Sequence, residues 1–109
     1  MPVDTTRPIK EMSKAELKEL LRGKSLIVSP HAVDHLSEGQ RKIFKESELF
    51  NMIGRETPRK AYLQKNGRYA AYYRKKDGYR KIIIEIEGER AVVVSFIDTA
   101  ELPKIRFKG

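Results

Sequence analysis

The sequence predicts an α+β domain of two layers, with N-terminal helices packed on one face of a four-stranded antiparallel meander. Two short turns, Asn66-Gly67 and Asp77-Gly78, carry most of this prediction. Such pairs readily adopt the positive φ values that two-residue hairpin turns need. Where strand-like residues flank such a pair, the pair therefore predicts a β-hairpin. Helical periodicity comes first along the chain and strand alternation second, and this segregation is typical of α+β domains.

The start of the chain is expected to contain an arm and a first helix. Residues 1–12 are polar and contain prolines, so we expect a flexible N-terminal arm there and a single domain over residues 13–109. Ser13 stands three residues before Glu16, which is the spacing of a capping box, and a stripe of leucines follows until Gly23. This pattern predicts an amphipathic helix that packs by its leucines.

A second helix is expected after a short apolar run. Residues 26–28 are a candidate edge strand, and Ser29 and Pro30 then suit the cap and the first position of a helix. We expect this helix to end near Gly39, with a basic connector over residues 40–42.

A third helix precedes the change from helical to strand periodicity. Ser47 is its expected cap and Gly54 its end. The strands that follow are expected at residues 61–65, 68–76, 79–87 and 90–97, and the last hairpin turns at Gly88-Glu89.

The period of two sorts the expected sheet into two faces. Strict two-residue loops would place Tyr73 opposite Ile82 and Arg74 opposite Lys81. The apolar face would then carry Tyr69, Ala71, Tyr73, Ile82, Ile84 and Ile86, and the second face would carry Arg68, Tyr72, Arg74 and Lys81 beside Glu85. The second face therefore suits an anionic partner.

Composition favours a nucleic-acid partner without requiring one. The 109 residues carry a formal net charge of +8, which fits nucleic-acid binding, although many basic proteins bind none. The absence of cysteine excludes disulfides and thiolate sites. No apolar run is long enough to span a bilayer or to act as a signal peptide, so we expect a cytoplasmic protein with no membrane partner. The high charged fraction is compatible with a thermophilic source.

The two histidines, His31 and His35, are four residues apart and would share one face of a helix. Ala32 stands where a zinc peptidase motif needs glutamate, so zinc peptidase chemistry is not expected, and neither a metal nor another cofactor is assigned. His31 would then either cap its helix or transfer a proton, since imidazole titrates near neutrality.

The basic and aromatic residues of the second face form the main candidate site. Arg74 and Lys81 would stabilise a phosphorane by fixed charge, and Tyr72 would stack on a base or donate a proton. Arg68 would hold a flanking phosphate. The alternative is a charged, solvated strand face with no binding role. Further candidates for phosphate contacts are Arg41 and Lys42.

The segment from Ile27 to Ala32, followed by Arg41 and Ile43, resembles uncharacterised small domains whose helix opens with the pattern HAxxR. Those domains have been grouped by fold with RelE/ParE-type toxins and related microbial ribonucleases. The resemblance implies that His31 matches the histidine of the family. It also implies that basic residues lie on an open sheet face, and that a protein antitoxin would cover that face.

The sequence therefore leaves three hypotheses for the function of the protein. The first is a RelE-like toxin domain that binds RNA on its sheet face and cleaves it without a metal, with Arg74, Lys81, Tyr72 and His31 as catalytic residues. The second is a non-catalytic module that binds nucleic acid through the same groups. The third is an interaction domain with no nucleic-acid role.

Overall fold

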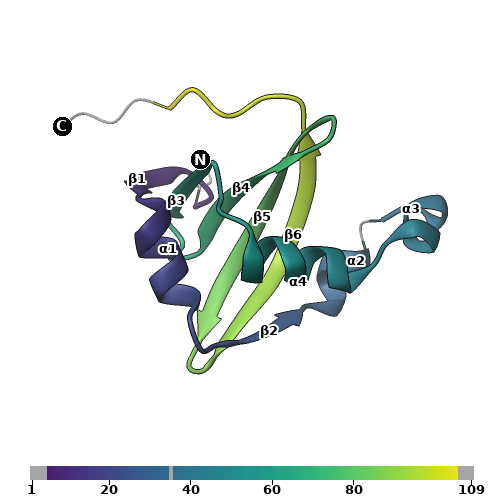
Figure 1. Ribbon diagram of the computed structural model, residues 1–109, viewed down its shortest axis with the longest axis horizontal. Coiled ribbons are helices and arrows are strands. Elements are labelled where there is room, and N and C mark those ends of the chain that lie inside the picture. The colour runs from purple at the N-terminus through teal and green to yellow at the C-terminus, as the bar shows by residue number, and fades with distance from the viewer. Residues whose placement is uncertain (1–4, 35, 106–109) are drawn as a thin grey trace.

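The computed structural model describes residues 5–34 and 36–105, which fold into a mixed six-stranded sheet and four short helices (Figure 1). The order of strands across the sheet is β1-β3-β4-β5-β6-β2. The elements in chain order are β1 (Pro8–Met12), α1 (Lys14–Leu21), β2 (Ser25–Val28), α2 (Pro30–Asp34), α3 (Glu38–Ile43), α4 (Glu46–Arg55), β3 (Lys60–Gln64), β4 (Tyr69–Lys75), β5 (Gly78–Glu87) and β6 (Arg90–Thr99).

The expected four-stranded antiparallel meander with helices on one face is wrong. Strands β3 to β6 do form an antiparallel meander, but β1 adds antiparallel to β3 and β2 adds parallel to β6. Residues 8–12, which fall within the predicted arm, form β1. The helices α2 and α3 extend beyond the edge of the sheet formed by β6 and β2 (Figure 1). Both added strands pair with segments far away in the sequence, and no local turn signal reports such pairing.

The main core lies between one face of the sheet, here called the helix face, and the helices α1 and α4. Leu17 and Leu21 of α1 and Leu49 and Ile53 of α4 are buried there at a spacing of four residues, which places each pair on one side of its helix. The sheet contributes Ala61, Ala71, Tyr73, Ile82, Ile84, Ala91 and Val93. Burial of one such Leu or Ile side chain stabilises by about 1.5–3 kcal/mol, which these short helices need because they are marginal in isolation.

Two of the expected helix starts are confirmed, and three other details of the helices are wrong. Ser13 and Glu16 form the reciprocal capping box, and the Ser29 hydroxyl accepts a hydrogen bond from the backbone N–H of His31. The second helix ends at Asp34, and the expected connector 40–42 belongs to α3, because Ser37 provides an additional capping box. The helix α4 begins at Glu46, before the expected Ser47 cap.

The register of the β4–β5 hairpin differs from the expected one, but the side chains of β4 and β5 lie on the faces that were expected. Tyr73 pairs with Arg80, and Arg74 pairs with Tyr79, because the turn consists of Lys76-Asp77 and Gly78 already lies in β5. This is a shift of two residues relative to the expected pairing, and an even shift keeps every side chain on its side of the sheet. The expected apolar face is accordingly confirmed: Tyr73, Ile82 and Ile84 are at most 1% exposed.

The opposite face is the basic face, which carries Lys60, Arg68, Arg74 and Lys81. Residues 100–105 follow β6 and are called the post-β6 segment; in Figure 1 this segment leaves the end of β6 and crosses the top of the view toward the side of β1 and β3. Its Leu102 and Ile105 pack on this face against Tyr62, Ala70 and Tyr72. The meander therefore has a second, smaller apolar cluster on the face that the sequence predicted to be open.

Candidate nucleic-acid interface

Two cation–tyrosine pairs occupy the β4–β5 part of the basic face. The Arg74 guanidinium carbon lies 5.1 Å from the centre of the Tyr79 ring, and the Lys81 ammonium nitrogen lies 5.8 Å from the centre of the Tyr72 ring. The register brings these pairs together, because Arg74 is directly opposite Tyr79 and Lys81 is directly opposite Tyr72. Among the described residues, no carboxylate lies within ion-pair distance of Arg74 or Lys81.

The other two cations of the basic face have carboxylate partners. Arg68 Nε lies 3.4 Å from Glu85 Oε1, and Lys60 Nζ lies 2.9 Å from Glu11 Oε1. The hydrogen bond to Glu11 raises the pKa of Lys60. These pairs are partly exposed, so each contributes little to stability. Arg68 reaches an anionic ligand only in competition with Glu85, whereas the charges of Arg74 and Lys81 are not neutralised in this way.

Tyr72 lies on the basic face, as predicted, but it is only 6% exposed. Its ring meets the ring of Tyr62 edge to face, with 6.1 Å between the ring centres. Burial raises the pKa of both tyrosines, and Tyr62 raises that of Tyr72 further. As arranged here, Tyr72 presents no open ring face to a base and is poorly placed to lose a proton near neutral pH.

His31 lies on α2, and Arg41 and Lys42 lie on α3, whereas Arg74 and Lys81 lie on β4 and β5; Figure 1 shows α2 and α3 extending beyond the β6–β2 edge of the sheet. Asp34 links the first two, because its carboxylate lies 3.9 Å from His31 Nδ1 and 3.7 Å from Arg41 Nη2. The structure thus brings Arg74, Lys81 and Tyr72 together and leaves His31 apart. His35, the other half of the histidine pair, lies outside the described residues.

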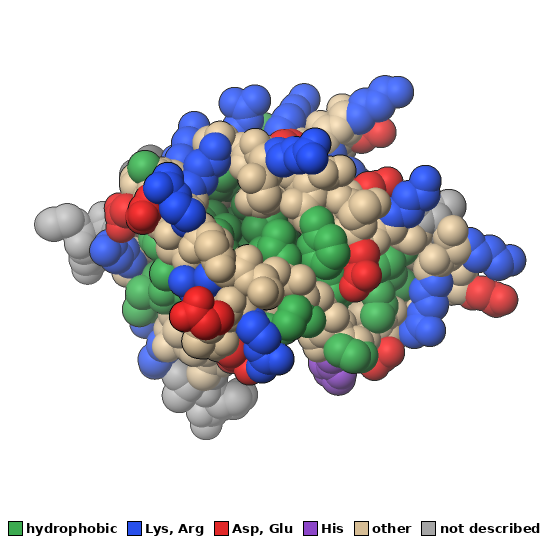
Figure 2. All heavy atoms as spheres, turned by 60° about the horizontal axis from the view of Figure 1, so that its bottom comes forward, with side chains coloured by type: hydrophobic (Ala, Val, Ile, Leu, Met, Phe, Trp, Pro, Cys, Tyr) green, Lys and Arg blue, Asp and Glu red, His purple; other side chains and the backbone are tan. Residues whose placement is uncertain are grey.

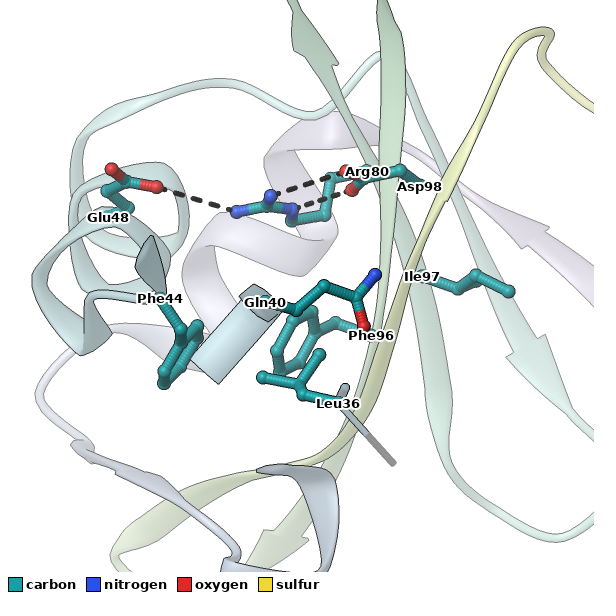
Figure 3. Close-up of a pocket in the computed structure, with 8 residues that line it drawn as sticks. All are labelled: Leu36, Gln40, Phe44, Glu48, Arg80, Phe96, Ile97 and Asp98. Atoms are coloured by element: carbon teal, nitrogen blue, oxygen red, sulfur yellow. Dashed lines mark hydrogen bonds and ion pairs between the residues drawn. The ribbon is translucent and has the colours of Figure 1, made fainter. Parts of the chain in front are cut away.

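A hollow of about 450 Å³ on the helix side contains residues that the sequence did not single out (Figure 3). The stacked rings of Phe44 and Phe96 lie 5.3 Å apart between centres, and Arg80 lies over Phe96. Its other lining residues are Leu36, Gln40, Glu48, Ile97 and Asp98.

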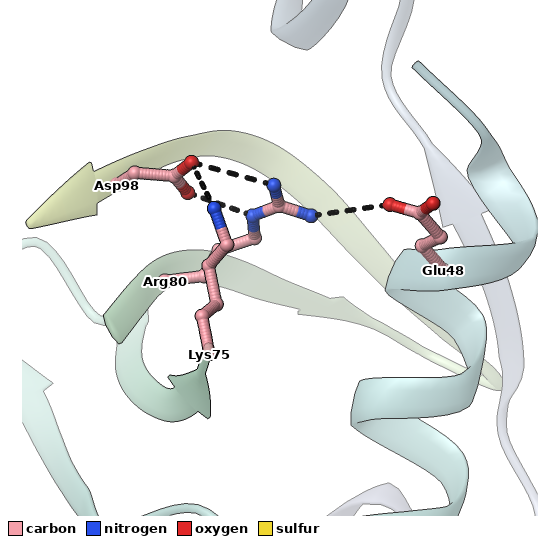
Figure 4. Close-up of polar contacts among 4 residues, drawn as sticks. All are labelled: Glu48, Lys75, Arg80 and Asp98. Atoms are coloured by element: carbon pink, nitrogen blue, oxygen red, sulfur yellow. Dashed lines mark hydrogen bonds and ion pairs between the residues drawn. The ribbon is translucent and has the colours of Figure 1, made fainter. Parts of the chain in front are cut away.

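The charges in this hollow compensate one another. Arg80 Nε donates a 2.8 Å hydrogen bond to Asp98 Oδ1, Lys75 also pairs with Asp98, and Glu48 lies on the other side of the guanidinium (Figure 4). Burial raises the pKa of Asp98, but the hydrogen bonds from Arg80 and Lys75 lower it, and the net direction is down. Two cations thus face two carboxylates, so these charges at the hollow balance one another.

Positive charge is not confined to the basic face. In Figure 2, which brings the end with the β5–β6 turn forward, hydrophobic side chains lie in the middle of the view with Lys and Arg around them. One groove in this part of the molecule has the apolar residues Leu21, Leu26 and Ile53, and its cations are Lys18, Arg22 and Lys24. What distinguishes the basic face is therefore the pairing of cations with tyrosines on rigid strands.

Tyr62, Tyr79 and Lys60 also lie on the basic face, and the sequence did not single them out as candidates. Tyr79 shares the face of Lys81 in either register, but only the observed register places it opposite Arg74. The position of Tyr62 depends on how β3 pairs with β4. The alternation of Lys60, Tyr62 and Gln64 along β3 was the available signal, since these positions share a face.

No family model matches the chain, and searches of curated proteins and of solved structures gave no match. Within the described ranges, no helix is long and apolar enough to cross a membrane.

Proposed function

We propose that the chain binds single-stranded RNA on its basic face, with Arg74 and Lys81 as contacts to backbone phosphates. The observation that carries this proposal is the pair of cations that lie on neighbouring strands, each over a tyrosine ring, without a carboxylate partner among the described residues. A cation that a protein leaves unpaired on a rigid strand can neutralise a phosphate without first breaking an ion pair.

Single-stranded RNA is the ligand that this chemistry suits best. A sheet face with aromatic rings can stack on unpaired bases while neighbouring Lys and Arg side chains follow the phosphates. Tyr79, which is partly buried, is the ring nearest to Arg74. The net charge of +8 would assist the approach of any polyanion.

The geometry supports binding more than cleavage. General acid–base catalysis needs a proton carrier within hydrogen-bond reach of the reacting atoms. Tyr72 is buried with a raised pKa, and His31 belongs to α2, so neither lies beside Arg74 and Lys81 as an accessible proton carrier. Incubation of labelled RNA with the protein in EDTA would reveal metal-independent cleavage, and this activity would replace the binding proposal by an enzymatic one.

The binding proposal is tested by fluorescence anisotropy with a labelled single-stranded RNA of mixed sequence, titrated at several salt concentrations. Arg74→Gln and Lys81→Gln should each weaken binding and should each reduce the slope of log affinity against log salt by about 0.7. Lys14→Gln is the matched control, because Lys14 is an exposed cation of α1, on the helix side.

Wild-type affinity that does not change with salt would refute the proposal. Equal losses in Arg74→Gln, Lys81→Gln and Lys14→Gln would also refute it, because they would indicate general charge attraction without a defined face. A matched single-stranded DNA tests whether the 2′-hydroxyl contributes, since only RNA carries it.

A further inference from the structure

Two tyrosines of the basic face are buried beneath the post-β6 segment. Tyr62 is 2% exposed and Tyr72 is 6% exposed, although both stand on the sheet face that carries Lys60, Arg68, Arg74 and Lys81. The residues that pack over them are Leu102 and Ile105, and Ile83 of β5 completes the cluster. The burial of the tyrosines thus depends on a segment outside the sheet.

The post-β6 segment is held less firmly than the strands beneath it. It has no regular secondary structure, and both Leu102 and Ile105 are only partly buried. A hydrogen bond of 3.1 Å from Thr99 Oγ1 to the carbonyl oxygen of Glu101 ties its beginning to β6. The three partly buried apolar residues of the segment, Leu102, Pro103 and Ile105, must therefore offset the conformational entropy lost by six ordered residues. A ligand that binds Tyr62 and Tyr72 therefore has to displace only these few apolar contacts of the post-β6 segment.

We propose that Tyr62 and Tyr72 form a subsite for unpaired nucleobases, which the post-β6 segment occupies in the free protein and RNA uncovers on binding. This inference rests on the proposed function. It adds that the RNA must have unpaired bases and that the post-β6 segment controls their access to the two tyrosines. Tyr62 and Tyr72 lie on the neighbouring strands β3 and β4, and the Lys81 ammonium lies 5.8 Å from the Tyr72 ring centre. A phosphate on Lys81 therefore brings its own base beside Tyr72.

The subsite favours unpaired bases over duplex RNA. Stacking on a side chain requires an open base face, which a base inside a duplex does not offer. The proposal therefore separates two contributions: Arg74 and Lys81 give salt-dependent affinity for any RNA, and the tyrosines give salt-independent affinity for single strands.

The first test weakens the cover in the full chain. A Leu102→Ala/Ile105→Ala double variant should bind a mixed-sequence 10-nucleotide RNA several-fold more tightly than the wild type, with no change for a duplex of the same sequence. Ile97→Ala is the matched control, because Ile97 is 60% exposed and opposite Lys81 on the same face but lies outside the covered cluster. An unchanged or lower affinity of the double variant for the single strand would overturn the inference.

The second test removes the tyrosine ring. Tyr62→Leu should lower affinity for the single strand about tenfold without changing the salt slope, since stacking releases no counterions. Unchanged affinity would overturn the inference. If the variant loses its circular dichroism signal, it is unfolded, and the third test, which uses the wild-type protein, decides.

The third test follows the post-β6 segment in the wild-type protein. Addition of the single-stranded RNA should accelerate tryptic cleavage after Lys104, identified by mass spectrometry, because the bases displace the segment. Slower or unchanged cleavage would overturn the inference. Absence of any salt-dependent RNA binding would instead refute the proposed function, so the two failures are distinguishable.

Discussion

Gly78 begins β5, pairs with Lys75 of β4 and lies close to the backbone of Thr99, so its replacement by alanine should be strongly destabilising. Its φ is +133°, a conformation that side-chain-bearing residues rarely adopt, and a Cβ atom there would lie 2.5 Å from the Thr99 carbonyl oxygen. Backbone strain of this kind costs about 1–3 kcal/mol, and relief of the overlap costs about 1–3 kcal/mol more. The expected loss in free energy of unfolding is therefore roughly 2–6 kcal/mol for Gly78→Ala.

Two other glycines provide matched controls for this measurement. Gly67 also has a positive φ, of +85°, but a Cβ atom would meet nothing within 4 Å, so Gly67→Ala should cost only about 1–2 kcal/mol. Gly54 lies inside α4 with open space around it, and Gly54→Ala should stabilise by about 0.5–1 kcal/mol. Urea unfolding measures all three changes, provided that the m-value stays constant. A Gly78→Ala variant as stable as Gly67→Ala would refute the reasoning from the close approach to Thr99.

Two further predictions concern polar side chains on the helix face of the sheet. The Tyr73 hydroxyl is buried without a hydrogen-bond partner among the described residues, so Tyr73→Phe should leave thermal stability unchanged or raise it, and a clear fall in melting temperature would contradict this. The pKa of Asp98 lies below its ordinary value of 3.8, so its ion pairs contribute stability that is complete above that value and is lost as pH falls through the lower folded-state value. The wild type should therefore lose more stability on acidification below about pH 4 than Asp98→Asn does, and parallel acid-unfolding curves for the two proteins would argue against this.

Local signals in the sequence predicted the parts of the fold that depend on neighbouring residues. The Ser13–Glu16 capping box and the Gly88-Glu89 turn stand as expected, because each is decided within a few residues. The faces of β4 and β5 were also predicted correctly, since the register error was an even number of residues.

The parts that the sequence did not predict depend on distant contacts. In β1, Ile9 is 47% exposed and its neighbours Lys10 and Glu11 are polar, so the strand lacks the alternation that would identify it before its pairing with β3 is known. The cover over Tyr62 and Tyr72 depends on Leu102 and Ile105, whose packing no turn or periodicity reports. The sequence therefore placed Arg68, Arg74 and Lys81 correctly on one face of the sheet, but it took Tyr72 on that face to be accessible.

Lysine footprinting tests directly whether RNA binds the basic face, because it reports which face of the protein the RNA covers. The protein would be acylated with and without saturating single-stranded RNA, and modification of each lysine would be quantified by mass spectrometry. We expect strong protection of Lys81 on the basic face and unchanged modification of Lys14 on α1. Protection of Lys14 with full reactivity at Lys81 would contradict this expectation.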